Sequence, residues 1–281
     1  MARRDEIASL VSLLDDEDEA VAVDAMAELL RREDELGDIL AEAQESGNPL
    51  MRRRVHQLEA AITLRRRRRE FRRKLQQPHV DLIDGLIDVH LQWYDNDSRP
   101  ELVRLWADFL RESRRFPKRT FEHIAYFLRK SGFTATEETT MRPEYYCLGP
   151  VLENRIGAGS VLAAVAAAIA DPELAPRMIR VMGEFALFDG ERLLIPAHDW
   201  RIAPAPDVTN CEFWDKRQLL KYASMTLFSA AVNSDSFRYV LTIAQALNGE
   251  EEEHALDGFP YPYYPAEEEE TGGDPDAVGG L

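Results

Sequence analysis

The sequence predicts a mainly α-helical protein of the α+β class, in which helices surround a small antiparallel sheet. Three observations support this fold class. Apolar residues recur at helical spacing over residues 4–75, 80–130 and 213–247. Three short runs rich in β-compatible residues lie together between residues 178 and 195. An almost unbroken apolar run at residues 161–170 predicts a helix buried on every side.

The N-terminal segment, residues 1–77, is expected to form a helical module. Its first helix has one apolar face made of Ile7, Leu10, Val11 and Leu14, and the acidic run at residues 15–18 ends it. Further helices are predicted at residues 21–30, at residues 36–43, and from Pro49 onward. This helix, acidic turn and helix are typical of a single HEAT-type pair. One such pair cannot bury its own apolar face, so we expect it to pack on its neighbours.

The helix after Pro49 is strongly basic in a chain whose net charge is −17. That charge argues against general affinity for nucleic acid, and no DNA binding is expected. The five consecutive basic residues are Arg65, Arg66, Arg67, Arg68 and Arg69. They fit either a solvated connecting helix, balanced by acidic surfaces nearby, or a docking surface for an acidic partner.

Three further helices are predicted before the apolar run, at residues 80–94, 100–113 and 118–130. Ser98 and Glu101 have the spacing of a capping box at the start of the second, and Gly132 is placed to end the third. His90 and His123 lie within these helices without the spacing of metal ligands, so we interpret them as packing residues. Residues 133–149 have no period and are expected to form a loop.

The segment 150–171 is the centre of the predicted structure. Glycines at 157 and 159 precede the apolar run and allow close approach to the helix N-terminus, where unpaired N–H groups favour anions and nucleophiles. The helix is therefore either a core element or an active-site element. Strands are predicted after it at residues 178–182, 184–188 and 192–195, followed by an irregular stretch at 196–206 and closing helices at 213–232 and 234–247.

The motifs around this centre resemble those of one protein family. Residues 124–128 read Ile-Ala-Tyr-Phe-Leu, then come Gly132-Phe133, Tyr145-Tyr146, and Val-Leu-Glu-Asn-Arg-Ile-Gly at 151–157. This order resembles the SirB-type transglutaminase-like family of bacteria, over about residues 5–248. The resemblance implies a HEAT-like module, a transglutaminase or papain-like core at 78–210, and a tetratricopeptide-like helix pair at 211–249. An acidic tail that we expect to be disordered follows at 250–281.

The resemblance implies that the family's catalytic positions are degenerate in this chain. Ser160 is displaced by one residue from the family's serine, and Glu184 stands where the family has histidine, in Gly183-Glu184-Phe185. A working acyl-transfer site needs an activated nucleophile beside a base. We therefore expect no catalytic residues and a non-catalytic protein that acts as a protein-interaction or regulatory module.

Two alternatives remain open at this stage. The first is a cysteine-dependent hydrolase or amidase that pairs Cys147 with His198 and with Asp199 or Asp207. The second is a peptide-binding helical-repeat protein with an apolar groove between the first helices and the closing pair.

Cysteine content and apolar run lengths suggest a location. Two cysteines are too few for a disulfide framework and fit a reducing compartment. The start of the sequence lacks the apolar core of a signal peptide, and the longest apolar run is about half of what a membrane span needs. We expect a cytoplasmic protein with no metal, no cofactor and no transmembrane segment, and with a protein partner whose identity the sequence does not give.

Overall fold

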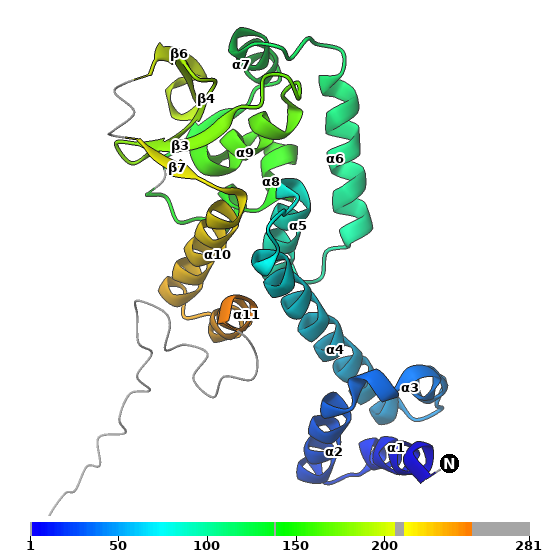
Figure 1. Ribbon diagram of the computed structural model, residues 1–281. Coiled ribbons are helices and arrows are strands. Elements are labelled where there is room, and N and C mark those ends of the chain that lie inside the picture. Colours follow the sequence, from blue (N-terminus) through cyan, green and yellow to red (C-terminus); the bar gives the residue numbers. More distant parts are fainter. Residues whose placement is uncertain (1, 138, 206–210, 249–281) are drawn as a thin grey trace, which may run out of the picture.

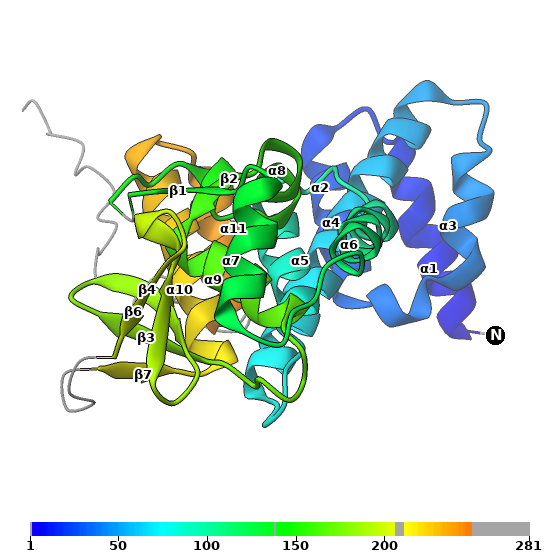
Figure 2. The same cartoon turned by 90° about the horizontal axis from the view of Figure 1, so that it is seen from above.

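The computed structural model describes residues 2–137, 139–205 and 211–248. The chain is mostly helical and has one small antiparallel sheet, as the sequence predicts. The N-terminal helices lie at one end of the molecule and the sheet at the other, and the long helix α4 (Pro49–Gln76) runs between them (Figures 1 and 2). None of the helices in the described ranges has both the length and the apolar character to cross a membrane.

Helices make up the N-terminal part of the chain, which we call the N-terminal module. It consists of α1 (Ala2–Ser12), α2 (Glu19–Arg31), α3 (Gly37–Gln44) and the first half of α4. Asp18 caps α2 by accepting the Ala20 N–H, and Asn48 caps α4 by accepting the Leu50 N–H. The apolar faces of these helices meet in one cluster of buried side chains, which includes Ile7, Leu14, Leu29, Leu36, Val55 and Leu58.

Helix α4 belongs to two cores at once. Val55, Leu58 and Ile62 from its first half lie in the cluster of the N-terminal module. Phe71 and Leu75 from its second half lie in the larger cluster that fills the rest of the molecule. The change from one core to the other therefore falls within a continuous helix and not at residue 77, where the sequence placed the boundary. The helix continues where the core changes, because its successive turns can face different neighbours.

Three of the five consecutive arginines bind the N-terminal module. Arg65 donates from Nη1 to the carbonyl oxygen of Leu30 at 2.9 Å. Arg69 pairs with Glu33, and Arg66 Nε lies 4.0 Å from the same carboxylate. The Glu33 side chain is almost fully buried, so these guanidiniums compensate a charge that would otherwise be costly to bury.

The other two arginines bind the main body of the protein. Arg67 donates to the carbonyl oxygen of Asp95 at 2.7 Å, and Arg68 donates to the side chain of Gln245. All five guanidiniums thus make contacts within the chain. The basic stretch joins the N-terminal module to the rest of the molecule, while the side chains of Arg66 and Arg69 stay 60% and 42% exposed.

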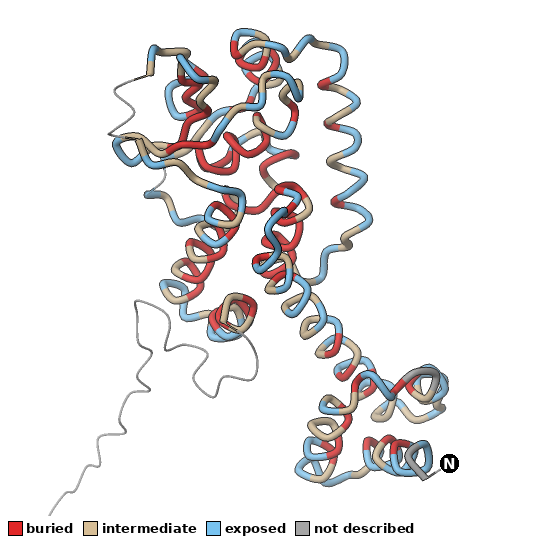
Figure 3. The backbone as a smooth tube through the Cα atoms, viewed as in Figure 1, coloured by how far each residue is buried: buried red, intermediate tan, exposed pale blue. Residues whose placement is uncertain are grey.

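The main body is built around α9 (Gly159–Ile169), with other helices on several sides. These are α5 (Leu82–Trp93), α6 (Arg99–Ser113), α7 (Phe121–Lys130), α8 (Leu148–Asn154), α10 (Lys216–Asn233) and α11 (Phe237–Asn248). Helix α9 contacts α5, α7, α10 and the sheet. Its side chains from Val161 to Ala166 have no exposed surface, which confirms the predicted central helix (Figure 3). Ala168, near its end, is exposed.

A short strand separates α8 from α9 where the sequence suggested only a glycine-edged turn. Arg155 ends α8 in the left-handed region, with φ of 62°. Strand β2 (Ile156–Ala158) then pairs in parallel with β1 (Thr134–Thr136), which lies in the segment expected to be a loop. The pairing begins with the Thr134 N–H, which donates to the carbonyl oxygen of Arg155 at 2.9 Å. Three residues per strand are too few to show a periodic pattern in the sequence.

The main sheet contains the three predicted strands and two more. The strands are β3 (Arg177–Val181), β4 (Glu184–Phe188), β5 (Arg192–Ile195), β6 (Arg201–Pro204) and β7 (Glu212–Trp214), in the antiparallel order β6-β5-β4-β3-β7. Met178, Phe185, Leu187 and Leu194 belong to the main core, which includes α9, while Ile179, Ala186, Leu193 and Ile195 form a separate cluster. Glycines with positive φ, Gly183 and Gly190, occupy the two hairpin turns.

Four local predictions need correction or confirmation. Strand β6 lies in the stretch expected to be irregular. Strand β7 takes the start of the helix predicted at residues 213–232, which begins at Lys216 with a capping box between Asp215 and Gln218. The Ser98 side chain makes no capping hydrogen bond to α6, so that capping box is wrong. Gly132 does end α7 with φ of 81°, as expected. The acidic tail lies outside the described residues.

Candidate functional site

Ser160, the polar residue at the start of the central helix, lies in the first turn of α9 and is fully buried. The residues before it, 157–159, are buried as well. The glycines at 157 and 159 were expected to allow close approach to this helix end, but none of the residues 157–160 lines any of the hollows described below. A hydroxyl closed off in this way cannot be reached by a substrate.

Glu184, the second residue that the resemblance singled out, makes a contact that the sequence did not suggest. Its Oε2 atom lies 2.7 Å from Nε2 of His198, in the 3-10 turn (Pro196–His198) that follows β5. The structure thus joins a residue of the degenerate site to a residue of the alternative hydrolase site. Both side chains are nearly half exposed, so the pair lies at the surface and stabilises the fold little.

Cys147, the nucleophile of the hydrolase alternative, is fully buried at the N-cap of α8. Burial raises the pKa of its thiol well above the ordinary value, and the charges of Glu144 and Asp97 act in the same direction. The sulfur makes no hydrogen bond to His198, which pairs with Glu184. Asp199 faces Arg129, with 3.5 Å between carboxylate oxygen and Nε, and Asp207 lies outside the described residues.

His90 is a buried histidine that uses both ring nitrogens. Nδ1 accepts the Gly149 N–H at 3.3 Å, which leaves Nε2 to donate to Asp97 Oδ2 at 2.8 Å. A Cβ atom at residue 149 would lie 2.7 Å from the ring, so only glycine allows this approach. Burial lowers the pKa of His90, although Asp97 opposes the shift. This arrangement agrees with a packing role and keeps the ring neutral.

We expect acidification to weaken the fold through His90. The pKa of its imidazole is lower in the folded protein than in the unfolded chain, so the unfolded chain takes up a proton first as the pH falls below about 6.5. The free energy of unfolding should therefore decrease from about pH 7.5 to about pH 5.5. Urea unfolding across this range measures the effect. The decrease should be smaller in His90→Gln, and an equal decrease in both proteins would contradict the assignment.

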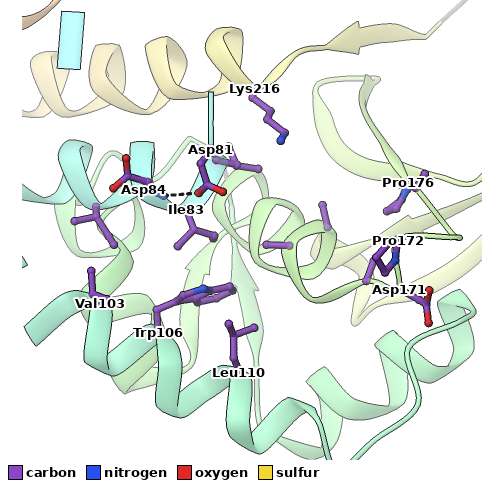
Figure 4. Close-up of a pocket in the computed structure, with 16 residues that line it drawn as sticks. Asp81, Ile83, Asp84, Val103, Trp106, Leu110, Asp171, Pro172, Pro176 and Lys216 are labelled. Atoms are coloured by element: carbon purple, nitrogen blue, oxygen red, sulfur yellow. Dashed lines mark hydrogen bonds between the residues drawn. The ribbon is translucent and has the colours of Figure 1, made fainter. Parts of the chain in front are cut away.

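An open groove of about 680 Å³ lies between α6 and the C-terminal end of α9, the end away from Ser160. Three other hollows measure about 400 to 610 Å³. We call the open groove the α6 groove. Val103, Trp106 and Leu110 project into it from α6, and Ile83 faces them from α5 (Figure 4). Its remaining apolar wall includes Ala167, Ala168, Pro172 and Pro176. A groove of this size falls within the range of ordinary ligand sites.

Four charged side chains line the rim of the α6 groove: Asp81, Asp84, Asp171 and Lys216. Asp84 is neutralised by Lys74, with 2.5 Å between Nζ and Oδ2, and by Arg99. Burial would raise the pKa of Asp84, but the hydrogen bonds and charges of these two cations outweigh it and lower the pKa. This carboxylate therefore stays ionised and is occupied within the chain.

The other two carboxylates on the rim make fewer and weaker interactions with cations of the chain than Asp84 does. Asp81 caps α5 by accepting the Asp84 N–H through Oδ1 and makes no ion pair with any residue in the described part of the chain. Asp171 accepts the Glu173 N–H, and its nearest cation, Arg119, is 3.9 Å away. A smaller hollow of about 400 Å³ shares Leu82, Ala167, Pro176 and Lys216 with the α6 groove and extends it toward β7.

The described residues that line the groove include no nucleophile–base pair. Within the described residues, no three His, Cys, Asp or Glu side chains gather as metal ligands would. The sequence did not single out Trp106, Asp81, Asp171 or Lys216. They come from four separate segments, and only the predicted amphipathic helix at 100–113 hinted that one of them faces a neighbour. Comparison with protein-family models, curated proteins and solved structures gives no match.

Proposed function

We propose that this chain is a non-catalytic protein with a transglutaminase-like core, and that it acts by binding a partner protein in the α6 groove. One observation carries the proposal: the N-terminal end of α9 at Ser160, one residue from the expected nucleophile position, is closed, and the open hollow lies at the opposite end of the same helix. Ser160 and Ala167 are seven residues apart, a rise of about 10 Å along α9.

The order of elements supports the transglutaminase-like part of the proposal. A short helix and a glycine-containing strand precede the buried helix α9, and an antiparallel sheet follows it. The contact between Glu184 and His198 joins the start of β4 to the turn after β5, the part of the sheet from which the resemblance implies that the base and acid come. The hydrolase alternative has less support, because thiol chemistry needs a thiolate, and burial favours the protonated form of Cys147.

The first test is the reactivity of Cys147. We expect iodoacetamide to leave Cys147 unmodified in the folded protein and to modify it once urea unfolds the chain, because a buried thiol with a raised pKa is a poor nucleophile. Peptide mass mapping after timed alkylation gives the result. Rapid modification of Cys147 under native conditions would favour the hydrolase and count against our proposal.

The second test concerns the α6 groove. The wild-type protein and Ser160→Ala should retain the same proteins from a native lysate, whereas Trp106→Ala should lose at least one of them. Quantitative mass spectrometry of the retained proteins compares the three baits. If Trp106→Ala retains everything that the wild type retains, the groove is not the interaction site; if Ser160→Ala alone changes the set, the closed end of α9 has a role after all.

A further inference from the structure

Helix α6 offers apolar side chains that the protein itself does not cover. Val103 is 48% exposed, and Trp106 and Leu110 are only partly buried although they pack against the main core. Ala168 on α9 is exposed on the opposite wall. Tryptophan is enriched among the residues that dominate binding energy at interfaces, especially where it sits in a partly enclosed position. The floor of the α6 groove is therefore suited to apolar side chains of a partner.

The charges around this floor favour a cationic partner. Among the described residues, Asp81 has no ion-pair partner and Asp171 has only Arg119, 3.9 Å away, while Lys216 is the one basic side chain that lines the groove. Figure 4 shows Asp81 above Trp106 and Asp171 beyond Pro172, so carboxylates stand at two separate places along the opening. The net charge of −17 adds a long-range attraction for basic proteins.

We propose that the α6 groove binds a basic amphipathic segment of a partner protein. This inference rests on the function proposed above and names the chemistry of the partner. Apolar side chains of the segment pack on Trp106, Leu110 and Ile83, and flanking lysines or arginines pair with Asp81 and Asp171. An acidic segment would bring its carboxylates against these two aspartates and is disfavoured, because like charges at an interface repel.

Defined peptides test the proposal. One labelled peptide of about twelve residues carries leucines at helical spacing and lysines elsewhere, and a second carries glutamates in place of the lysines. Fluorescence anisotropy gives their dissociation constants for the wild-type protein. We expect the lysine peptide to bind, with an affinity that falls as salt is added, and the glutamate peptide to bind at least about ten-fold more weakly.

Matched variants separate the groove from general attraction to an acidic protein. Asp81→Asn with Asp171→Asn removes two charges but keeps both side-chain carbonyls that accept backbone N–H groups. We expect about five-fold weaker binding from this pair, and about ten-fold weaker binding from Trp106→Ala. The control pair, Asp5→Asn with Asp24→Asn, removes the same charge from exposed positions on α1 and α2, which do not line the groove, and should change binding less than about two-fold.

Each outcome bears on one of the two proposals. Equal binding of both peptides, or equal weakening by the control pair, overturns the preference for a basic segment. If the lysine peptide fails to bind while Trp106→Ala still loses a lysate protein, the groove is an interaction site for another kind of partner. If Trp106→Ala changes neither the lysate proteins nor the peptide affinity, the proposed function fails as well.

Discussion

Asp88→Ala should reduce the free energy of unfolding by about 3–5 kcal/mol, the usual cost of removing one partner from a buried ion pair. The Asp88 side chain is 5% exposed and lies between two cations. Its Oδ2 accepts from Lys74 Nζ at 2.6 Å, and its other oxygen pairs with Arg99. Without this carboxylate, Lys74 and Arg99 remain close together and have only the more exposed Asp84 as a shared partner. Urea unfolding followed by circular dichroism measures the loss.

The exposed Asp108 provides the control for Asp88. It lies on α6 with Arg111 as its neighbour, and Asp108→Ala should change stability by less than about 1 kcal/mol. Adding Lys74→Met to Asp88→Ala should restore part of the loss, because it removes one of the two cations left without Asp88. A loss below about 1 kcal/mol in Asp88→Ala would mean that the network is well solvated and would contradict our account.

Trp200→Ala should have an effect of similar size, about 3–5 kcal/mol, because it opens a cavity in the main core. The indole has no exposed surface, and its Nε1 donates to the carbonyl oxygen of Phe133 at 2.8 Å. Trp200 adopts a positive φ of 57°, a conformation that costs energy for a large residue. Arg129 compensates by donating to the carbonyl oxygens of Asp199 and Trp200.

Two comparisons make the Trp200 prediction specific. Trp200→Phe keeps most of the ring but loses the hydrogen bond to Phe133, so its loss of stability should be smaller than that of Trp200→Ala. Trp106→Ala removes the same side chain from the half-exposed α6 groove and should cost less than Trp200→Ala. Similar losses in both alanine variants would contradict the burial that we assign to Trp200. They would also complicate the use of Trp106→Ala as a binding variant.

Long elements with a clear period could be predicted from the sequence. The N-terminal helices, α5 to α7, the buried helix α9 and the first three strands of the sheet all fall close to their expected places. The errors concern short elements. Strands β1, β2, β6 and β7 have three or four residues each, and they exist because a neighbouring strand supplies their hydrogen bonds, which no local pattern reveals.

The candidate site was less accessible to sequence analysis. The residue types at Ser160 and Glu184 led us to expect no catalytic pair, but they did not indicate that Ser160 would be fully buried. The pairing of Glu184 with His198 needs a register between β4 and β5 that the sequence does not specify. The charge pattern at residues 65–69 was correctly identified as basic. Its partners come from three segments far apart in the chain, at Leu30 and Glu33, at Asp95 and at Gln245, so their convergence could only be seen in the structure.

Because α4 is continuous, the number of residues in it sets the rotation of the N-terminal module about the helix axis relative to the main body. Each residue of an α-helix adds about 1.5 Å of length and, at 3.6 residues per turn, about 100° of rotation. One residue inserted between Ile62 and Phe71 would turn the whole module by about that angle around the helix axis. A seven-residue insertion would return it to within about 20° while moving it outward by about 10 Å. Insertions of these two lengths therefore separate the effect of the module's orientation from the effect of its distance. The arginines before the insertion keep their place relative to the module, and those after it keep their place relative to the main body.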